Sequence, residues 1–109
     1  MYLGLDLGTS GLRGLLVQAD GEAIGSAAAE YAVARPNPGW SEQNPNDWIT
    51  AVNRVIGILR HQYAEEFSKL KGIGVAGHMH GAVLVDAIGE VLNPCILWND
   101  TRASKEAAL

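Results

Sequence analysis

The chain has 109 residues, a length that allows one small domain. Hydrophobic residues make up 48% and charged residues 18%, the composition of an ordinary soluble globular protein. The formal net charge is -4 and the Lys and Arg residues are scattered, which excludes the clustered basic surface of a nucleic-acid-binding protein.

The sequence also argues against secretion and membrane insertion. The amino terminus lacks the basic start and apolar core of a signal peptide, and no apolar stretch approaches the ~20 residues needed to cross a bilayer. Cys95 is the single cysteine, and we expect it to be a small buried residue rather than a catalytic thiol. We therefore expect a cytoplasmic protein with no membrane and no nucleic-acid partner.

Three strands are predicted at the start of the chain. Residues 2–7 are an apolar run that ends in a Gly-Thr-Ser-Gly turn at 8–11, and a second apolar run covers 12–18. An Asp-Gly pair at 20–21 predicts a tight turn before a third strand over 23–33. We expect the three strands to form an antiparallel meander.

A long helix is predicted after a loop at 35–46 that is rich in Pro, Asn and Gly. Asn44 or Asn46 can cap this helix, which should cover residues 46–63 and could extend to Phe67. Its predicted apolar face consists of Trp48, Ile49, Val52, Val55, Ile56 and Leu59.

The second half of the chain is expected to add further strands and the start of a helix. Residues 71–77 are apolar and glycine-rich, which is typical of a buried strand, and shorter strands are predicted over 82–86 and 96–98. A helix from Arg102, capped by Asp100 or Thr101, reaches the last residue without a stop signal. We interpret it as a truncated helix, with a frayed terminal helix as the alternative.

The first candidate site is the turn that follows the first strand. The carboxylate of Asp6 can project toward Mg²⁺, which prefers carboxylate and phosphate oxygens. Glycines let the backbone approach phosphate oxygens, and the hydroxyls and the arginine add donors. The residues concerned are Gly8, Thr9, Ser10, Gly11 and Arg13. The alternative is an ordinary hairpin turn beside a solvated aspartate.

Two later segments carry polar groups that could hold a small substrate. The spacing of His78 and His80 puts both on one face of a strand, where they could bind a metal or, at the strand end, a polar substrate. A core histidine is the alternative for His78. Trp98 and Asp100 offer an apolar surface and a hydrogen-bonding group for a sugar, or else a buried Trp and a helix cap.

In this order, these segments resemble the start of the FGGY family of carbohydrate kinases. The residues that carry the resemblance are 2–11, 40–45, 74–82 and 96–102. The first segment is shared with the wider actin, hexokinase and chaperone ATPase fold, whereas Trp-x-Glu-Gln at 40–43 is typical of the FGGY group. The Met79-His80 pair resembles the members that phosphorylate D-xylulose, although Arg13 stands where these tend to have Lys.

The resemblance implies an α/β ribonuclease-H-like fold of the actin and hexokinase type, with a five-stranded mixed sheet and helices on both faces. Residues 1–109 would be the amino-terminal part of its first domain. ATP and Mg²⁺ are implied as cofactors, with Asp6 organising the metal through water and residues 8–11 binding the phosphates. Met79 and His80 would contact the sugar, and Trp98 and Asp100 would line the same pocket.

The implied activity is the phosphorylation of D-xylulose to D-xylulose 5-phosphate by a full-length protein. A homodimer is compatible with this expectation. We expect residues 1–109 alone to be inactive, because the family's catalytic Asp lies beyond them. One alternative is another sugar or polyol kinase of the family, acting on ribulose, gluconate or glycerol. The other is a non-catalytic nucleotide-binding module of the actin-like fold.

Overall fold

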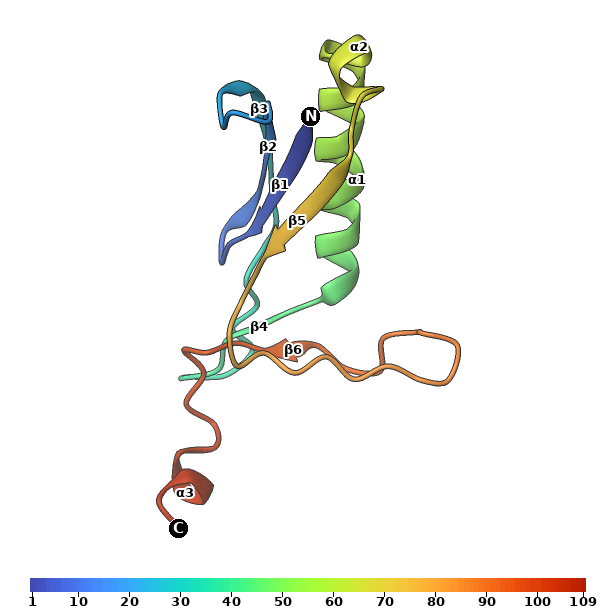
Figure 1. The fold of residues 1–109 in the computed structure, drawn as a ribbon. Coiled ribbons are helices and arrows are strands. Elements are labelled where there is room, and N and C mark those ends of the chain that lie inside the picture. The colour runs from blue at the N-terminus through green and yellow to red at the C-terminus, as the bar shows by residue number, and fades with distance from the viewer.

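The computed structural model describes residues 1–109 and has a four-stranded mixed sheet in the order β3-β2-β1-β5. One long helix covers one face of this sheet, and a separate two-stranded sheet lies beyond its lower end (Figure 1). The elements are β1 (Tyr2–Leu7), β2 (Gly11–Val17), β3 (Ala23–Glu30), β4 (Glu42–Gln43), α1 (Pro45–Gln62), α2 (Ala64–Phe67), β5 (Gly72–Ala76), β6 (Cys95–Ile96) and α3 (Ser104–Ala107).

The predicted antiparallel meander is confirmed. β1 pairs with β2 so that Asp6 lies opposite Arg13, and β2 pairs with β3. The turn between β2 and β3 uses Gly21 at a φ of 90°, a left-handed conformation that glycine adopts without a steric penalty. The third strand ends at Glu30, three residues before its predicted end.

The long helix is also confirmed, with Asn44 as its cap. The Asn44 side chain accepts a hydrogen bond from the backbone N–H of Asn46, and Pro45 occupies the first turn. The helix stops at Gln62, because Tyr63 leaves the helical conformation at a φ of -129°. Residues 64–67 therefore form a separate short helix instead of continuing α1.

The core lies between α1 and the sheet. Its buried residues come from alternate positions of the strands and from one stripe of the helix. They are Leu3, Leu5, Leu12, Ala29, Ala51, Val55 and Leu59. Ile49 was predicted on the apolar face of the helix, but its side chain is 62% exposed, so that assignment is wrong.

The β5 strand runs parallel to β1, with Gly4 opposite Gly74 and Asp6 opposite Ala76. The prediction that this strand is buried is wrong for the described chain. It forms an edge of the sheet, and the Val75 side chain is 74% exposed. The cause is that α1 contacts β2 and β3, leaving the β5 side of this face uncovered.

The second half of the chain departs most from the sequence prediction. Residues 82–86 do not form a strand, because only a single bridge joins Val85 to Val91 in an arm that projects from the body (Figure 1). The strand predicted at 96–98 is Cys95–Ile96, which pairs with β4 outside the main sheet. The predicted last helix is one short turn, and neither Asp100 nor Thr101 caps it.

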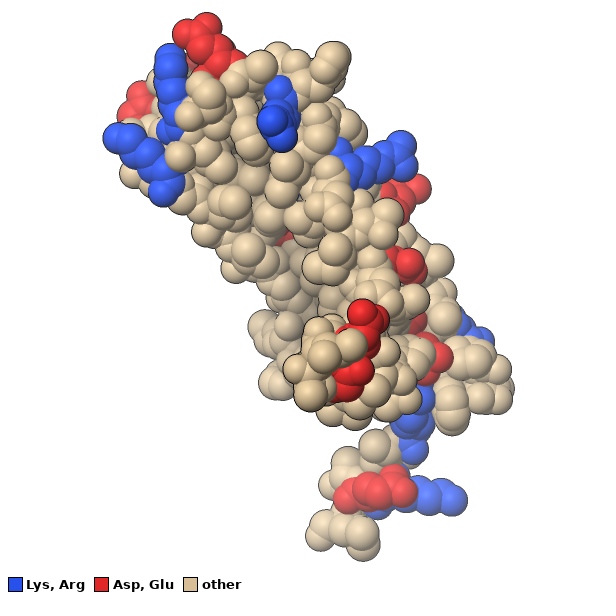
Figure 2. Space-filling model, turned by 90° about the vertical axis from the view of Figure 1, so that its right-hand side faces the viewer, with Lys and Arg blue, Asp and Glu red and all other residues tan.

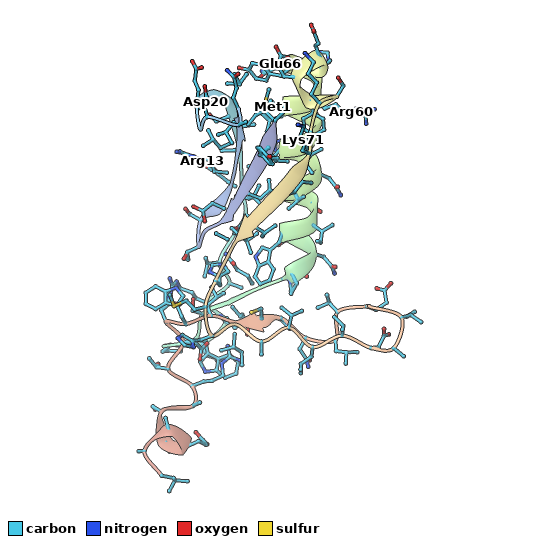
Figure 3. All side chains as sticks on the ribbon, in the orientation of Figure 1. Met1, Arg13, Asp20, Arg60, Glu66 and Lys71 are labelled. Atoms are coloured by element: carbon cyan, nitrogen blue, oxygen red, sulfur yellow. The ribbon has the colours of Figure 1, made fainter.

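The charged side chains are distributed over the surface as their scattered positions in the sequence predict. Basic side chains are interspersed with acidic ones on the face shown in Figure 2, without a basic patch. Figure 3 shows Arg13 projecting from β2 away from α1. None of the helices is long and apolar enough to span a membrane.

The contact between β2 and α1 leaves no room for a side chain at Gly14. A Cβ there would lie 2.4 Å from Cγ1 of Val55, whereas a Cβ on Gly57 in α1 would meet nothing within 4 Å. We predict that Gly14→Ala destabilises the protein by about 1–3 kcal/mol because it overpacks the core. We expect Gly57→Ala to stabilise it by about 0.5–1 kcal/mol. Urea unfolding of both variants checks this, and equal effects would contradict the packing described here.

Candidate functional site

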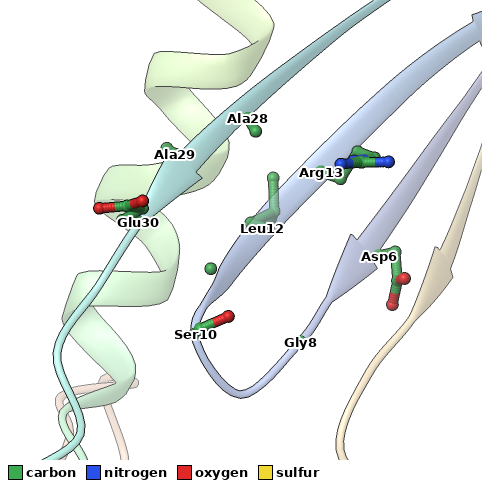
Figure 4. Close-up of a pocket in the computed structure, with 9 residues that line it drawn as sticks. Asp6, Gly8, Ser10, Leu12, Arg13, Ala28, Ala29 and Glu30 are labelled. Atoms are coloured by element: carbon green, nitrogen blue, oxygen red, sulfur yellow. The ribbon is translucent and has the colours of Figure 1, made fainter.

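A hollow of about 370 Å³ lies at the end of β1 and β2, beside the turn of residues 8–11, which we call the glycine turn. Its lining includes Asp6, Arg13 and Glu30, together with Gly8, Ser10 and Gly11 of the glycine turn (Figure 4). Asp6 and Arg13 are cross-strand partners and are both exposed. The hollow therefore combines an open backbone turn with two carboxylates and one guanidinium.

The carbonyl groups of the glycine turn all accept hydrogen bonds from the body of the protein. The Tyr31 hydroxyl donates to the carbonyls of Gly8 and Gly11, and the Tyr31 N–H donates to that of Ser10 at 3.3 Å. The Gln43 side chain donates to the Thr9 carbonyl at 2.6 Å. The N–H groups of Thr9 and Ser10 donate to no acceptor in the chain, which leaves them available to an anion.

The environment of Tyr31 favours its role as a donor. Burial, and then the negative charge of Asp6, raise the pKa of its hydroxyl above the usual value. The hydroxyl therefore remains a donor, and its single proton is shared between the carbonyls of Gly8 and Gly11.

The acidic groups of this site fit a metal ion that is coordinated mainly by water and by the phosphates of a bound substrate. No group of three or more His, Cys, Asp and Glu side chains is arranged to hold a metal ion. Mg²⁺ is commonly bound by one or two carboxylates together with water and the phosphates of a substrate. Asp6, which lines the hollow, meets that requirement.

The segment of residues 78–81, here called the histidine segment, follows the carboxyl end of β5. It therefore lies at the same end of the sheet as the glycine turn, which follows the carboxyl end of β1. This follows from the parallel pairing, in which Asp6 lies opposite Ala76. Met79 is 71% exposed, and His80 is exposed with a φ of 61°. A left-handed conformation is uncommon for a residue other than glycine, and such strain is concentrated at ligand sites.

The first histidine of this segment, His78, packs against an aromatic side chain of α1. The ring of His78 contacts that of Trp48, with 5.6 Å between the ring centroids and an angle of 47° between the planes. The His78 side chain is half-buried, and its Nε2 atom has no hydrogen-bond partner. His78 is therefore not a satisfied core histidine.

Trp98 and Asp100, predicted to line one pocket, have different surroundings. The side chain of Trp98 is 63% exposed, so it remains free to contact a ligand. The side chain of Asp100 is buried, and both its carboxylate oxygens accept hydrogen bonds from Arg102. One oxygen also accepts from the Ser41 N–H at 2.6 Å. Asp100 is thus engaged within the chain.

Arg102 joins Asp100 to strand β4 and to the loop that precedes it. Its guanidinium donates to Glu42 at 2.8 Å and lies 3.8 Å from the centre of the Trp40 ring. Hydrogen bonds from Arg102, followed by the Ser41 N–H, hold the pKa of Asp100 well below its usual range. Hydrogen bonds to Asp100 and Glu42 raise the pKa of Arg102.

The residues that hold the glycine turn were not predicted from the sequence. Tyr31 and Gln43 reach it from 20 or more positions away in the sequence. The only available signal was the Trp-x-Glu-Gln pattern at 40–43. Its second and fourth residues, Ser41 and Gln43, are both fully buried in the structure.

The Asp100–Arg102 pair predicts a specific pH dependence of stability. Because the folded-state pKa of Asp100 is depressed, its stabilisation is present above the unfolded-state pKa, near 3.8, and is lost as the pH falls through the folded-state value. We predict that the free-energy difference between wild type and Asp100→Asn is constant above about pH 5 and shrinks below about pH 4.

Urea unfolding between acidic and neutral pH measures this difference. Asp86→Asn is the matched control, because Asp86 also accepts backbone N–H bonds but has no arginine partner. A difference for Asp100→Asn that does not change with pH would contradict the assignment.

The fold and the site together define a class. An antiparallel meander with a glycine turn, followed by a helix and a parallel strand, is the α/β ribonuclease-H-like arrangement of the actin and hexokinase type. The sequence profile described as the FGGY family of carbohydrate kinases, N-terminal domain, matches residues 1–109. The chain belongs to this family.

Individual relatives are similar over nearly the whole chain. A xylulose kinase from Escherichia coli (strain K12) is 44% identical over 109 residues, which are 100% of this chain and 22% of that protein. A solved "xyloylose kinase" from Brucella ovis is 55% identical with a TM-score of 0.95, covering 98% of this chain and 22% of its own. A gluconate kinase from Lactobacillus acidophilus is 25% identical with a TM-score of 0.89, covering 98% and 21%. The chain thus spans about a fifth of the length of these relatives.

Proposed function

We propose that residues 1–109 are the amino-terminal part of a kinase that uses ATP to phosphorylate D-xylulose to D-xylulose 5-phosphate. The observation that carries the proposal is the glycine turn, whose carbonyls are all engaged while two adjacent N–H groups remain free. The xylulose kinases among the relatives support the choice of sugar. A cytoplasmic location and a homodimer are part of the same proposal.

The glycine turn would bind the phosphates of ATP. Backbone N–H groups of Thr9 and Ser10 would donate to phosphate oxygens, and Arg13 would add positive charge beside them. Asp6 would orient the water shell of Mg²⁺, and the metal would supply neutralisation of the phosphate charge. None of these roles requires a covalent step on the chain.

The histidine segment would bind the sugar at the same edge of the sheet. Exposed Met79 and His80 would contact the hydroxyl groups, and Trp98 would offer an apolar surface to the sugar carbons. We propose that Asp100 acts indirectly by holding the Trp98 end of the chain, since its oxygens are occupied. The general base that accepts the proton of the sugar hydroxyl would lie outside residues 1–109.

Removal of the Asp6 carboxylate tests its role in organising the metal. We predict that Asp6→Ala in the full-length protein lowers kcat/KM by about 100-fold or more, because charge stabilisation at the transferred phosphate is lost. The fold should remain, since Asp6 is exposed and outside the core. A coupled kinase assay measures the rates, and Asp20→Ala, at an exposed turn on the far end of β2, is the control. Normal turnover by Asp6→Ala would refute the role.

The sugar is tested by a substrate panel. We predict that the full-length protein has its highest kcat/KM with D-xylulose and lower values with ribulose, gluconate and glycerol. Gluconate is included because a gluconate kinase shares the fold. Residues 1–109 alone should turn over none of these sugars. A preference for another sugar would reassign the substrate, and ATP binding without turnover of any sugar would favour a non-catalytic module.

A further inference from the structure

Gln43 occupies a position between the two halves of the proposed site. It lies in β4, and its side chain is 1% exposed. On one side its Nε2 atom donates to the Thr9 carbonyl in the glycine turn at 2.6 Å. On the other side its Oε1 atom accepts from Nε1 of Trp48 at 3.0 Å. A single buried amide therefore joins the glycine turn to helix α1.

The chemistry of its partners fixes the orientation of this amide. A carbonyl oxygen can only accept, so the NH₂ group must face Thr9. An indole N–H can only donate, so the amide oxygen must face Trp48. A flipped amide would leave both contacts unmade, and a side chain of the same length without polar atoms would leave two buried groups without partners.

The connection continues from Gln43 to the histidine segment by two routes. Through its side chain, Gln43 holds Trp48, whose ring contacts that of His78. Through its backbone, Gln43 pairs with buried Cys95 of β6. Cys95 in turn packs against Gly81, where an added Cβ would lie 3.0 Å from its sulfur. Both ends of the histidine segment are therefore anchored to the residue that anchors the glycine turn.

We propose that Gln43 is a positioning residue, which fixes the placement of the phosphate-binding turn relative to the sugar-binding segment. This inference rests on the proposed kinase function. Because the Gln43 side chain is buried and each of its polar atoms has a partner within the chain, we assign it no direct contact with either substrate. Phosphoryl transfer depends on alignment of the attacking hydroxyl with the phosphorus, and an error of about 1 Å can cost roughly 100-fold in rate.

The test is Gln43→Met in the full-length protein, which keeps the length of the side chain and removes both hydrogen bonds. We predict that kcat falls by about 10-fold or more, while the KM values for ATP and D-xylulose each change by less than about threefold. A large rise in KM for one substrate with unchanged kcat would indicate a direct binding role and overturn the proposal. Wild-type kcat and KM would overturn it as well.

Two further variants separate positioning from stability. Val55→Ala leaves a cavity in the core under β2, and Val55 is not one of the residues of the connection, so this variant should lower the melting temperature and leave kcat unchanged. Trp48→Phe keeps an aromatic ring next to His78 but removes the N–H that donates to Gln43. We therefore expect kcat to fall, as in Gln43→Met. Equal loss of kcat in Val55→Ala would reduce the effect of Gln43 to stability and contradict the proposal.

A readout without activity distinguishes failure of this inference from failure of the proposed function. In two-dimensional NMR spectra, Gln43→Met should shift the backbone amide signals of both residues 8–11 and residues 78–81, whereas Val55→Ala should shift neither set. If the wild type phosphorylates no sugar but both sets of signals respond, the kinase function fails and the connection through Gln43 stands. If neither set or only one responds, the connection through Gln43 is wrong.

Discussion

The site depends on the parallel pairing of β1 with β5. A parallel pair needs a crossover connection, which α1 supplies by packing its Ala51, Val55 and Leu59 stripe on the sheet. Because β1 and β5 run in the same direction, their carboxyl ends lie at the same end of the sheet. The glycine turn follows β1 there, and the histidine segment follows β5. Their proximity is thus a consequence of topology, and it does not require any direct contact between them.

We propose that the glycine turn is an anion site that is built without a helix. In a P-loop, backbone N–H groups face the phosphates at the start of a helix. Here Tyr31 and Gln43 engage the carbonyl groups of a hairpin turn, which leaves the N–H groups of Thr9 and Ser10 unpaired. The donors to the carbonyls are therefore as much a part of the site as the glycines.

Local signals in the sequence were sufficient for the first half of the fold. Alternating apolar residues, the Asp-Gly turn and the Asn44 cap each act within a few residues, and the meander and α1 follow from them. Features set by distant partners were not predictable. The strand at Glu42–Gln43 exists only because it pairs with Cys95–Ile96, and the engagement of Asp100 by Ser41 joins positions 59 residues apart. The exposure of β5 likewise depends on which element covers the sheet.

We propose that both substrates bind at the end of the sheet where β1 and β5 terminate, with ATP on the glycine turn and the sugar on the histidine segment. A crystal structure of the full-length protein with a non-hydrolysable ATP analogue, Mg²⁺ and D-xylulose tests this directly. We expect phosphate oxygens about 2.7–3.2 Å from the N–H nitrogens of Thr9 and Ser10, and a sugar hydroxyl at hydrogen-bond distance from His80. Phosphates bound away from this turn, or a sugar on the other side of the sheet from Asp6, would contradict it.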